Sequence, residues 1–329
     1  MLSEILMLSP VMPYAFLIAG LVLLYFGAKW LVEAGAKLAI RLGVTPLLVG
    51  LTIVAFGTST PELVVSVQSA MAGVGNISIG NVLGSNICNI ALILGLSAII
   101  VPLTAPKLLF RRDIPVCVVA SLLAWLFLTN GNTMFFWEGI VLLVLFVGYA
   151  GYIIISTKRG AGVDAPPDDI ISTVNEKTDS VVKSIVFIII GLAALVAGAD
   201  ILVKGAIVLA ASLGVSEALI GLTIVAVGTS LPELATSIVA ALKKQNDIAI
   251  GNVVGSNIFN ILLILGTVGV MGPVEAKGIL LRDMLLMVAL SVALFVPILT
   301  RRVMTRWFGV VLTAVYVAYI FVLCRGVVS

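Results

Sequence analysis

The sequence predicts an all-α membrane protein with ten transmembrane helices, arranged as two inverted five-helix repeats. The first observation is composition: 61% of the 329 residues are hydrophobic and only 11% are charged, whereas a soluble domain carries about 25% charged residues. The second is a succession of apolar stretches close to the roughly 20 residues that a helix needs to cross a bilayer, without the alternating pattern of an outer-membrane barrel. The third is an internal repeat. A soluble enzyme is therefore excluded.

The ten spans are read, in chain order, as the apolar stretches between polar or charged breaks. They cover residues 14–38, 44–70, 77–101, 113–130, 135–156, 184–208, 215–241, 248–270, 284–300 and 307–325. The residues before the first span contain Glu4 but no basic segment. We therefore expect the first span, residues 14–38, to be a retained helix and not part of a cleaved signal peptide.

One long polar stretch divides the chain. Residues 157–183 are rich in charged side chains and include Pro166 and Pro167. A segment of this composition cannot lie in the hydrocarbon of the membrane. It predicts a linker between a first repeat at 14–156 and a second at 184–325. The linker is too short for a calcium-sensing domain, and it shows no EF-hand pattern.

The repeat itself is strong. Residues 50–95 align with residues 221–266 at a constant offset of 171, and 29 of the 46 positions are identical. The copies start five spans apart, and an odd number of crossings turns the second copy upside down relative to the first. The sequence thus predicts inverted repeats.

The basic residues test this topology independently, because cytoplasmic loops are enriched in Lys and Arg. With the N-terminus outside, fourteen Lys and Arg fall in inside loops and three in outside loops, namely Lys277, Arg282 and Arg325. We therefore expect a multi-pass protein of the cell membrane with both termini outside and the central linker in the cytoplasm. Anionic lipid fits the modest net charge of +3, and neither nucleic acid nor a protein partner is predicted.

Each repeat carries the motif GTS(T/L)PE inside an apolar span, ending in Glu62 in the first copy and Glu233 in the second. Pro61 and Pro232 cannot donate a backbone hydrogen bond, so each helix should bend and free carbonyl oxygens at Gly57 and Gly228. A charged side chain near the bilayer centre costs at least about 2.5 kcal/mol. Both glutamates should therefore face the bundle interior and a cation.

Helical spacing adds further oxygens. Residues four apart share a helix face, as Thr58, Glu62 and Ser66 do. The same spacing recurs in three other sets, namely Thr229, Glu233 and Ser237; Asn81, Ser85 and Asn89; and Asn252, Ser256 and Asn260. For the first two asparagines of each GNVxGSNIxN motif, hydrogen bonding between helices is an equally good explanation. These are Asn81, Asn86, Asn252 and Asn257. The motif glycines are expected to serve close helix packing.

Oxygen ligands indicate a hard cation. Ca²⁺ takes six to eight oxygens, whereas zinc and copper favour imidazole or thiolate, and the chain has no His and three scattered Cys. Two carboxylates balance one divalent ion, and the same oxygens suit Na⁺. Exchange of Ca²⁺ for a monovalent ion follows as a hypothesis, with no resident cofactor.

The GTSxPE and GNVxGSNI motifs resemble those of the cation/Ca²⁺ exchanger superfamily, most closely its prokaryotic Na⁺/Ca²⁺ exchangers, over nearly the whole chain. The resemblance implies a Na⁺/Ca²⁺ antiporter in which the first and sixth helices slide across the others. It also implies a central site in which Glu62 and Glu233 are shared by both ions. The further ligands it implies are Thr58, Ser59, Thr229, Ser230, the carbonyls of Ala55 and Ala226, Ser85, Asn89, Ser256 and Asn260.

One position departs from part of that family, because several members have Asp where this chain has Asn260. The site is then less acidic, which argues against K⁺ co-transport. A Ca²⁺/H⁺ antiporter is the main alternative, since protonation of the two glutamates could replace Na⁺ binding, although GNV(L/V)GSN lacks the acidic residue usual in that branch. A cation channel would show net current without exchange. An intramembrane hydrolase lacks a nucleophile paired with a base.

Two pairs of opposite charges lie four residues apart inside spans. Lys29 and Glu33 are on the first span, and Asp200 and Lys204 are on the sixth. At that spacing each pair is expected to form a salt bridge near a helix end.

Overall fold

The computed structural model describes residues 11–129, 131, 133–158, 180–213, 226–275 and 281–328, and nearly all of them are helical. The helical segments of the first half, with η marking π-helices, are α2 (Met12–Leu42), α3 (Pro46–Val49), η1 (Gly50–Val54), α4 (Ala55–Thr58), α5 (Thr60–Met71), α6 (Gly75–Ile87), η2 (Cys88–Leu94), α7 (Gly95–Ile100), η3 (Leu109–Asp113), α8 (Ile114–Leu128) and α9 (Phe136–Lys158). Those of the second half are α11 (Val181–Ser212), α13 (Ala226–Gly228), α14 (Leu231–Leu242), α15 (Asn246–Phe259), η5 (Asn260–Leu265), α16 (Gly266–Gly269), α17 (Leu281–Ala293), the 3₁₀ helix η6 (Val296–Thr300) and α18 (Arg306–Val328).

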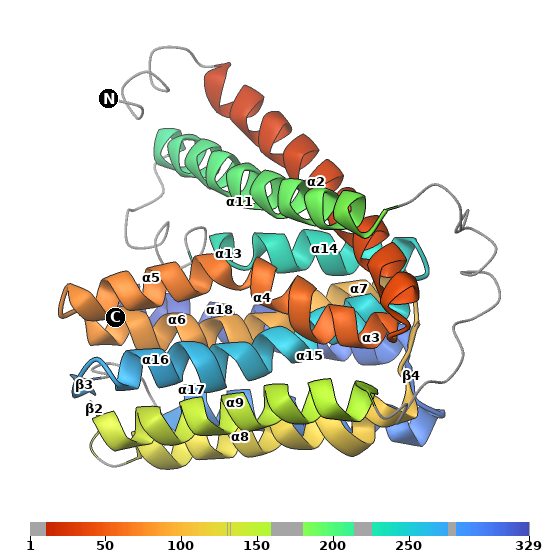
Figure 1. The fold of residues 1–329 in the computed structure, drawn as a ribbon. Coiled ribbons are helices and arrows are strands. Elements are labelled where there is room, and N and C mark those ends of the chain that lie inside the picture. The colour runs from red at the N-terminus through yellow and green to blue at the C-terminus, as the bar shows by residue number, and fades with distance from the viewer. Residues whose placement is uncertain are drawn as a thin grey trace.

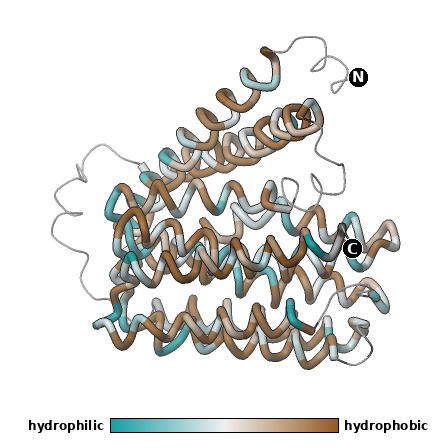
Figure 2. The backbone as a smooth tube through the Cα atoms, turned by 180° about the vertical axis from the view of Figure 1, so that it is seen from behind, coloured by the Kyte–Doolittle hydropathy of each residue, from teal (hydrophilic) through white to brown (hydrophobic). Residues whose placement is uncertain are grey.

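Within these described residues, seven helical segments are long and apolar enough to cross a membrane, and the bent pair formed by Pro46–Thr58 and Thr60–Met71 makes an eighth. The predicted fourth and seventh spans correspond to shorter helices, the 15-residue α8 and the 12-residue α14. Hydrophobic residues dominate along the helices (Figure 2). The chain is thus an all-helical multi-pass membrane protein. Most of the predicted linker, and the predicted start of the seventh span, lie outside the described residues.

Two pairs of very short strands show that the halves are inverted. β1 (Leu103–Thr104) pairs with β4 (Val303–Met304), and β2 (Thr133–Met134) pairs with β3 (Val274–Glu275), both antiparallel. The repeat offset of 171 converts β1 into β3, and an offset of 170 converts β2 into β4. Figure 1 shows β4 at one end of the bundle and β2 with β3 at the other. Equivalent segments therefore lie at opposite ends, as inversion requires.

Helices α2 and α11 pack on each other and cross the remaining helices at a marked inclination (Figure 1). With 31 and 32 residues, each is about 45 Å long at the usual rise per residue, which exceeds the roughly 30 Å hydrocarbon core and matches a tilted helix. Their contact depends on glycines. A Cβ on Gly27 would lie 2.8 Å from the Gly191 carbonyl oxygen, and a Cβ on Gly198 would lie 3.0 Å from that of Gly20.

The GNVxGSNI segments form the centre of the bundle. In an apolar 18-residue stretch of α15–η5–α16, 94% of the residues are buried, and in that of α6–η2–α7, 72%, against 17% in those of α9 and of α18. Gly251 and Gly255 allow α15 to touch the broken second span, because a Cβ on Gly255 would lie 2.7 Å from the Leu51 carbonyl oxygen. This confirms the packing role expected for those two glycines. The polar residues of the motifs are thereby held at the deepest point of the protein.

Candidate functional site

The GTSxPE motifs interrupt their helices in the same way. In the first repeat α4 ends at Thr58 and α5 begins at Thr60, and the axis bends by 44° there. In the second repeat α13 ends at Gly228 and α14 begins at Leu231. Pro61 and Pro232 each lie in the first turn of the new helix, where the missing N–H costs no hydrogen bond. The predicted bend is confirmed for the first motif.

These breaks place both glutamates at helix starts in the middle of the protein. Glu62 lies in the first turn of α5 and Glu233 in the first turn of α14, where the positive end of the helix dipole favours a carboxylate. Both side chains are fully buried. Neither has an ion-pair partner in the part of the chain that the structure describes. Two carboxylates thus face a dry interior without a protein cation.

Each glutamate is held by a serine of the other repeat. The Ser59 hydroxyl donates to Glu233 Oε1 at 2.9 Å, and the Ser230 hydroxyl donates to Glu62 Oε1 at 3.2 Å. Ser230 also lies 3.4 Å from the hydroxyl of Ser85 on α6. Because each serine directly precedes its new helix, the two helix breaks meet at the interface between the repeats.

Several buried oxygens near this crossing have no hydrogen-bond partner among the described residues. They are Oε2 of Glu62, Oε2 of Glu233, Oγ1 of Thr229, Oγ of Ser256, Oδ1 of Asn89 and Oδ1 of Asn260. Helix α5 contacts η5, which begins at Asn260, and α14 contacts η2, which contains Asn89. A buried oxygen without a hydrogen-bond partner raises the free energy of the folded state unless a bound ligand or ion interacts with it. A desolvated cation would satisfy all of them at once.

The asparagines at 89 and 260 lie at equivalent points in π-helical turns, and such turns often mark functional positions in membrane helices. Asn89 donates its amide to Asn257 Oδ1 at 3.0 Å, and its own Oδ1 has no hydrogen-bond partner among the described residues. Asn260 has neither amide atom bonded in the described structure.

Some predicted oxygens are engaged elsewhere. Asn81 donates to the Ser66 hydroxyl at 2.9 Å, and Asn252 donates to that of Ser237 at 3.0 Å. The expectation that Ser66 and Ser237 line up with the glutamates as free oxygens is therefore wrong, because each is tied to the next helix of its own repeat. The structural explanation for Asn81 and Asn252 is correct, since both also donate to the backbone carbonyl of the motif glutamate.

The Thr58 hydroxyl and the Ala55 carbonyl also form hydrogen bonds within the protein. The Thr58 hydroxyl lies within hydrogen-bond distance of Asn252 Oδ1, at 3.1 Å, and of the Ala55 carbonyl, at 3.3 Å. The Ala55 carbonyl in addition accepts the Ser59 N–H at 3.0 Å. Ala226, the counterpart of Ala55 in the second repeat, is the first residue of α13. Thr229 shows no such bond to an asparagine or a backbone carbonyl among the described residues, but each threonine lies beside the glutamate of the other repeat, Thr229 beside Glu62 and Thr58 beside Glu233.

A second duplicated cluster escaped the sequence analysis, which treated its arginines as topology signals. Arg112 forms an ion pair with buried Asp113 at 2.7 Å, and the Tyr149 hydroxyl donates to the same carboxylate at 2.9 Å. In the second half Arg282 lies 3.5 Å from Asp283, which also contacts Tyr319. A constant offset of 170 links the two sets, and that regularity could have revealed them. They connect the fourth and fifth spans of each half.

Oxygen atoms dominate the polar groups of the centre, although the buried thiol of Cys88 lies beside Ser230. No group of three or more His, Cys, Asp or Glu side chains is placed to hold a metal ion within the described ranges. Two carboxylates, hydroxyls and amides remain, a set that suits weakly polarisable cations such as Na⁺ and Ca²⁺. All of the candidate side chains with a described burial lie below the solvent-accessible surface except Thr229, which is partly exposed. An ion bound between these residues would be held away from water.

Comparisons with known proteins agree with this arrangement. A family model described as sodium/calcium exchanger protein matches residues 12–155 and 183–325. The inner membrane protein YrbG of Escherichia coli is 35% identical over 314 residues, covering 94% of this chain and 96% of the relative. The sodium/calcium exchanger MaX1 of Methanosarcina acetivorans is 33% identical over 342 residues, covering 94% and 98%. The solved structure of the sodium-calcium exchanger NCX_Mj soaked with Na⁺ and Ca²⁺ superposes with a TM-score of 0.79 at 33% identity, covering 94% of this chain and 98% of that one.

Proposed function

The chain belongs to the sodium/calcium exchanger protein family, and from that premise we propose that it is a Na⁺/Ca²⁺ antiporter that uses the Na⁺ gradient to extrude Ca²⁺. Membership of this family makes it a secondary cation transporter and not an enzyme. The site of exchange is the crossing of the two helix breaks, where Glu62 and Glu233 would bind either ion in turn.

The observation that carries this proposal is the group of unpaired buried oxygens around the two glutamates. Two carboxylates neutralise one Ca²⁺, and the hydroxyl and amide oxygens bring the number of ligands toward the six to eight that Ca²⁺ prefers. The same oxygens can be divided among Na⁺ ions. Because both ions need the same carboxylates, occupancy by one would exclude the other, which is the requirement for exchange.

The inverted repeats supply a route to alternating access. A site at the interface of two inverted halves can open to either side when one group of helices moves against the other. Helices α2 and α11, which pack on each other through glycines, would be the moving pair. With the site empty, two uncompensated carboxylates would have to pass an apolar barrier, at a cost of several kcal/mol. Ion binding would thus be a condition for the transition.

The orientation follows from the positive-inside rule. Lys37 and Arg41 lie at the end of α2, and Lys243 and Lys244 lie at the end of α14. These residues share one end of the bundle, because Lys243 contacts α2 through Glu33. We place this basic end in the cytoplasm, together with the linker at 157–183, and both termini outside.

The test is Ca²⁺ uptake into proteoliposomes that contain Na⁺, compared with vesicles that contain K⁺ and with vesicles that have only an acid interior. The proposal expects uptake that requires internal Na⁺. Uptake driven by the proton gradient alone would instead assign the chain to Ca²⁺/H⁺ antiport. Uptake that follows the Ca²⁺ gradient without a Na⁺ or proton gradient, with net current, would indicate a channel.

The residue assignment has its own test. Glu62→Gln and Glu233→Gln should each abolish Na⁺-dependent uptake while the purified protein keeps its size-exclusion profile. Glu275→Gln is the matched control, because Glu275 lies in β3 at the end of the bundle, and it should retain exchange. Robust flux in either of the first two variants would contradict the assignment.

A further inference from the structure

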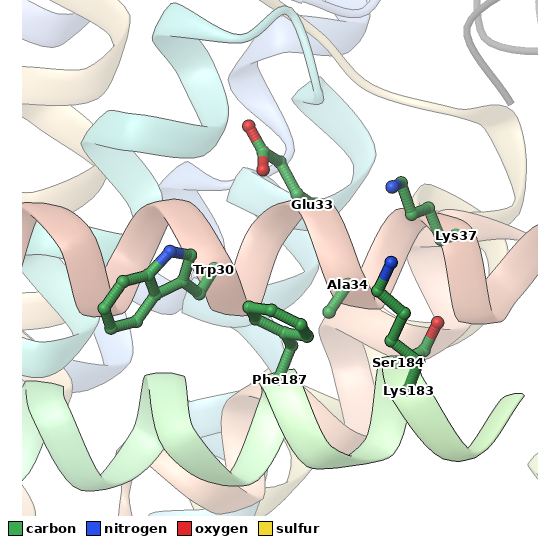
Figure 3. Close-up of a pocket in the computed structure, with 7 residues that line it drawn as sticks. All are labelled: Trp30, Glu33, Ala34, Lys37, Lys183, Ser184 and Phe187. Carbon is green, nitrogen blue, oxygen red and sulfur yellow. The ribbon is translucent and has the colours of Figure 1, made fainter. Parts of the chain in front are cut away.

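Helices α9 and α18 are equivalent in the two repeats, and they are the least buried of the described helices that are long enough to cross a membrane. Helices α2 and α11 line a pocket of about 170 Å³, shown with Trp30 and Phe187 in Figure 3, and none of its lining residues belongs to the candidate site. Helix α18, by contrast, packs against η2, and its Tyr316 lies beside the thiol of Cys88, which directly precedes the candidate ligand Asn89. An outer helix thus reaches the edge of the candidate site with a polar side chain.

Both side chains of this contact are shielded from lipid and from water. Cys88 is 3% exposed and Tyr316 is 8% exposed. A buried hydroxyl or thiol is stable only where polar groups surround it. Cys88 lies beside the Tyr316 hydroxyl, and it also lies beside Ser230, the serine that holds Glu62. The thiol is therefore placed between α18 and the helix break of the second repeat.

The direction of the donors in this group follows from Ser230. Its hydroxyl has one hydrogen, which it donates to Glu62 Oε1 at 3.2 Å, because a carboxylate is a stronger acceptor than a hydroxyl or a thiol. Its oxygen keeps two lone pairs, which are available to Ser85, 3.4 Å away, and to the thiol of Cys88. With the S–H directed to Ser230, the sulfur is left to accept from Tyr316. The hydrogens then point in one direction, from Tyr316 to Glu62.

The other half of the molecule has an apolar contact at the same place. The repeat offset of 171 converts Cys88 into Phe259, and an offset of 170 converts Phe146 into Tyr316. The rings of Phe146 and Phe259 lie edge to face, with their centroids 5.0 Å apart. Neither ring has an O–H or S–H to offer to the serine of a helix break. The polar contact with an outer helix is therefore a property of the Glu62 half and not of the repeat.

We propose that Cys88 and Tyr316 are positioning residues that hold the Ser230 hydroxyl on Glu62, so that α18 strengthens ion binding in one half of the site. Hydrogen bonds that follow one another in a buried setting polarise and strengthen each other. A serine that is already aimed at Glu62 orients the carboxylate before the ion arrives, so that binding requires less ordering of the site. This inference rests on the proposed function in one respect, because it takes Glu62 as an ion ligand.

Ca²⁺ binding by the purified full-length protein, measured by titration calorimetry in detergent without Na⁺, tests the effect on affinity. Tyr316→Phe removes only a hydroxyl and should lower the affinity about twofold to threefold, the low end for a neutral hydrogen bond, because a thiol is a weak partner. Cys88→Ala should lower it to the same extent. Cys88→Ser should restore it, because a serine hydroxyl both donates and accepts. Tyr319→Phe is the control, because this hydroxyl of α18 contacts Asp283, and it should leave the affinity unchanged.

The two equivalent serines separate positioning from a general effect on folding. In a protein that already carries Ser230→Ala, Tyr316→Phe should have no further effect, because the hydroxyl through which it acts is gone. In a protein that carries Ser59→Ala, Tyr316→Phe should cause its full loss of affinity, because the two changes lie in different halves of the site. Equal losses in the two backgrounds, or an equal loss in Tyr319→Phe, would overturn the proposal.

The infrared S–H stretching band of Cys88 tests the contacts of the thiol without any ion. The chain has three cysteines, so this band is isolated by subtracting the spectrum of Cys88→Ser. Hydrogen bonding shifts an S–H stretch, so Tyr316→Phe and Ser230→Ala should each move the band, whereas Ser59→Ala should not. An unmoved band in a protein that binds Ca²⁺ would overturn this inference alone. Failure of the unmodified protein to bind Ca²⁺ would contradict the proposed function and overturn the inference with it.

Discussion

Ser59 donates its hydroxyl to Glu233 at 2.9 Å, although the two residues are 174 positions apart and belong to different repeats. The reciprocal bond, from Ser230 to Glu62, is 3.2 Å long. The carboxylate of each half is thus oriented by the helix break of the other half. An ion bound between them would therefore couple the two repeats, and neither repeat alone could form the proposed site.

Ser59→Ala should weaken ion binding without unfolding the protein. A hydrogen bond to a charged group contributes about 1.5 to 3 kcal/mol, so the apparent affinity for Ca²⁺ is expected to fall roughly tenfold or more. Na⁺-dependent Ca²⁺ uptake as a function of Ca²⁺ concentration measures this. Thr60→Ala is the matched control, because Thr60 is exposed and its hydroxyl donates to the Phe56 carbonyl of α4 in the same repeat, away from either glutamate. An unchanged concentration dependence in Ser59→Ala would contradict the role given to this bond.

Asn252→Ala should destabilise the protein more than Asn81→Ala, although the two residues are equivalent in the repeats. Asn252 is fully buried and bonds Ser237, the Glu233 carbonyl and Thr58, whereas Asn81 is partly buried and bonds Ser66 and the Glu62 carbonyl. Each buried group left unpaired costs about 1 to 3 kcal/mol. Melting temperatures in detergent should show the order, and a larger decrease for Asn81→Ala would refute it.

The sequence was sufficient for those parts of the site that depend on local geometry or on the repeat. Pro61 and Pro232 fix where the helices break, and a glutamate one residue later must lie in the first turn of the new helix. The constant offset between the copies predicts that both breaks have the same form. The inverted arrangement follows from counting spans, and the strand pairs confirm it.

What the sequence could not predict are partners that meet only in the folded bundle. The prediction that Thr58, Glu62 and Ser66 share one face depends on one continuous helix. The helix break separates Thr58 from the other two residues, and Asn81 of the next helix donates a hydrogen bond to Ser66. Similarly, Glu33 was expected to pair with Lys29 because the two are four residues apart, yet it bonds Lys243, 210 positions away. The expected Asp200–Lys204 pair does form, at 2.6 Å.

Gly191→Ala should impair exchange because it separates the two crossing helices. A Cβ at this position would lie 2.8 Å from the Gly27 carbonyl oxygen and 2.9 Å from the Leu31 nitrogen, and these backbone atoms cannot move without the helix. We expect a lower melting temperature and a lower exchange rate. Gly148→Ala on α9 is the control, because a Cβ there would meet no atom within 4 Å, and alanine favours a helix by about 1 kcal/mol. Equal behaviour of the two variants would show that the contact is not tight.

The ion pair between Glu33 and Lys243 predicts a directional effect on transport. It joins α2 to the end of α14 at one end of the bundle, whereas Lys204, the residue equivalent to Glu33, pairs within its own helix. Movement of α2 would break the pair in only one of the two access states.

Glu33→Gln and Lys243→Gln should therefore change the ratio of the apparent Ca²⁺ affinities on the two sides of the membrane. A partly exposed ion pair contributes roughly 0.2 to 1 kcal/mol, so the change should be about 1.4-fold to fivefold. The double variant should equal each single variant, because both remove the same bond, and Asp200→Asn should have no effect. Additive changes in the double variant would mean that the two charges act independently and that the pair does not hold α2.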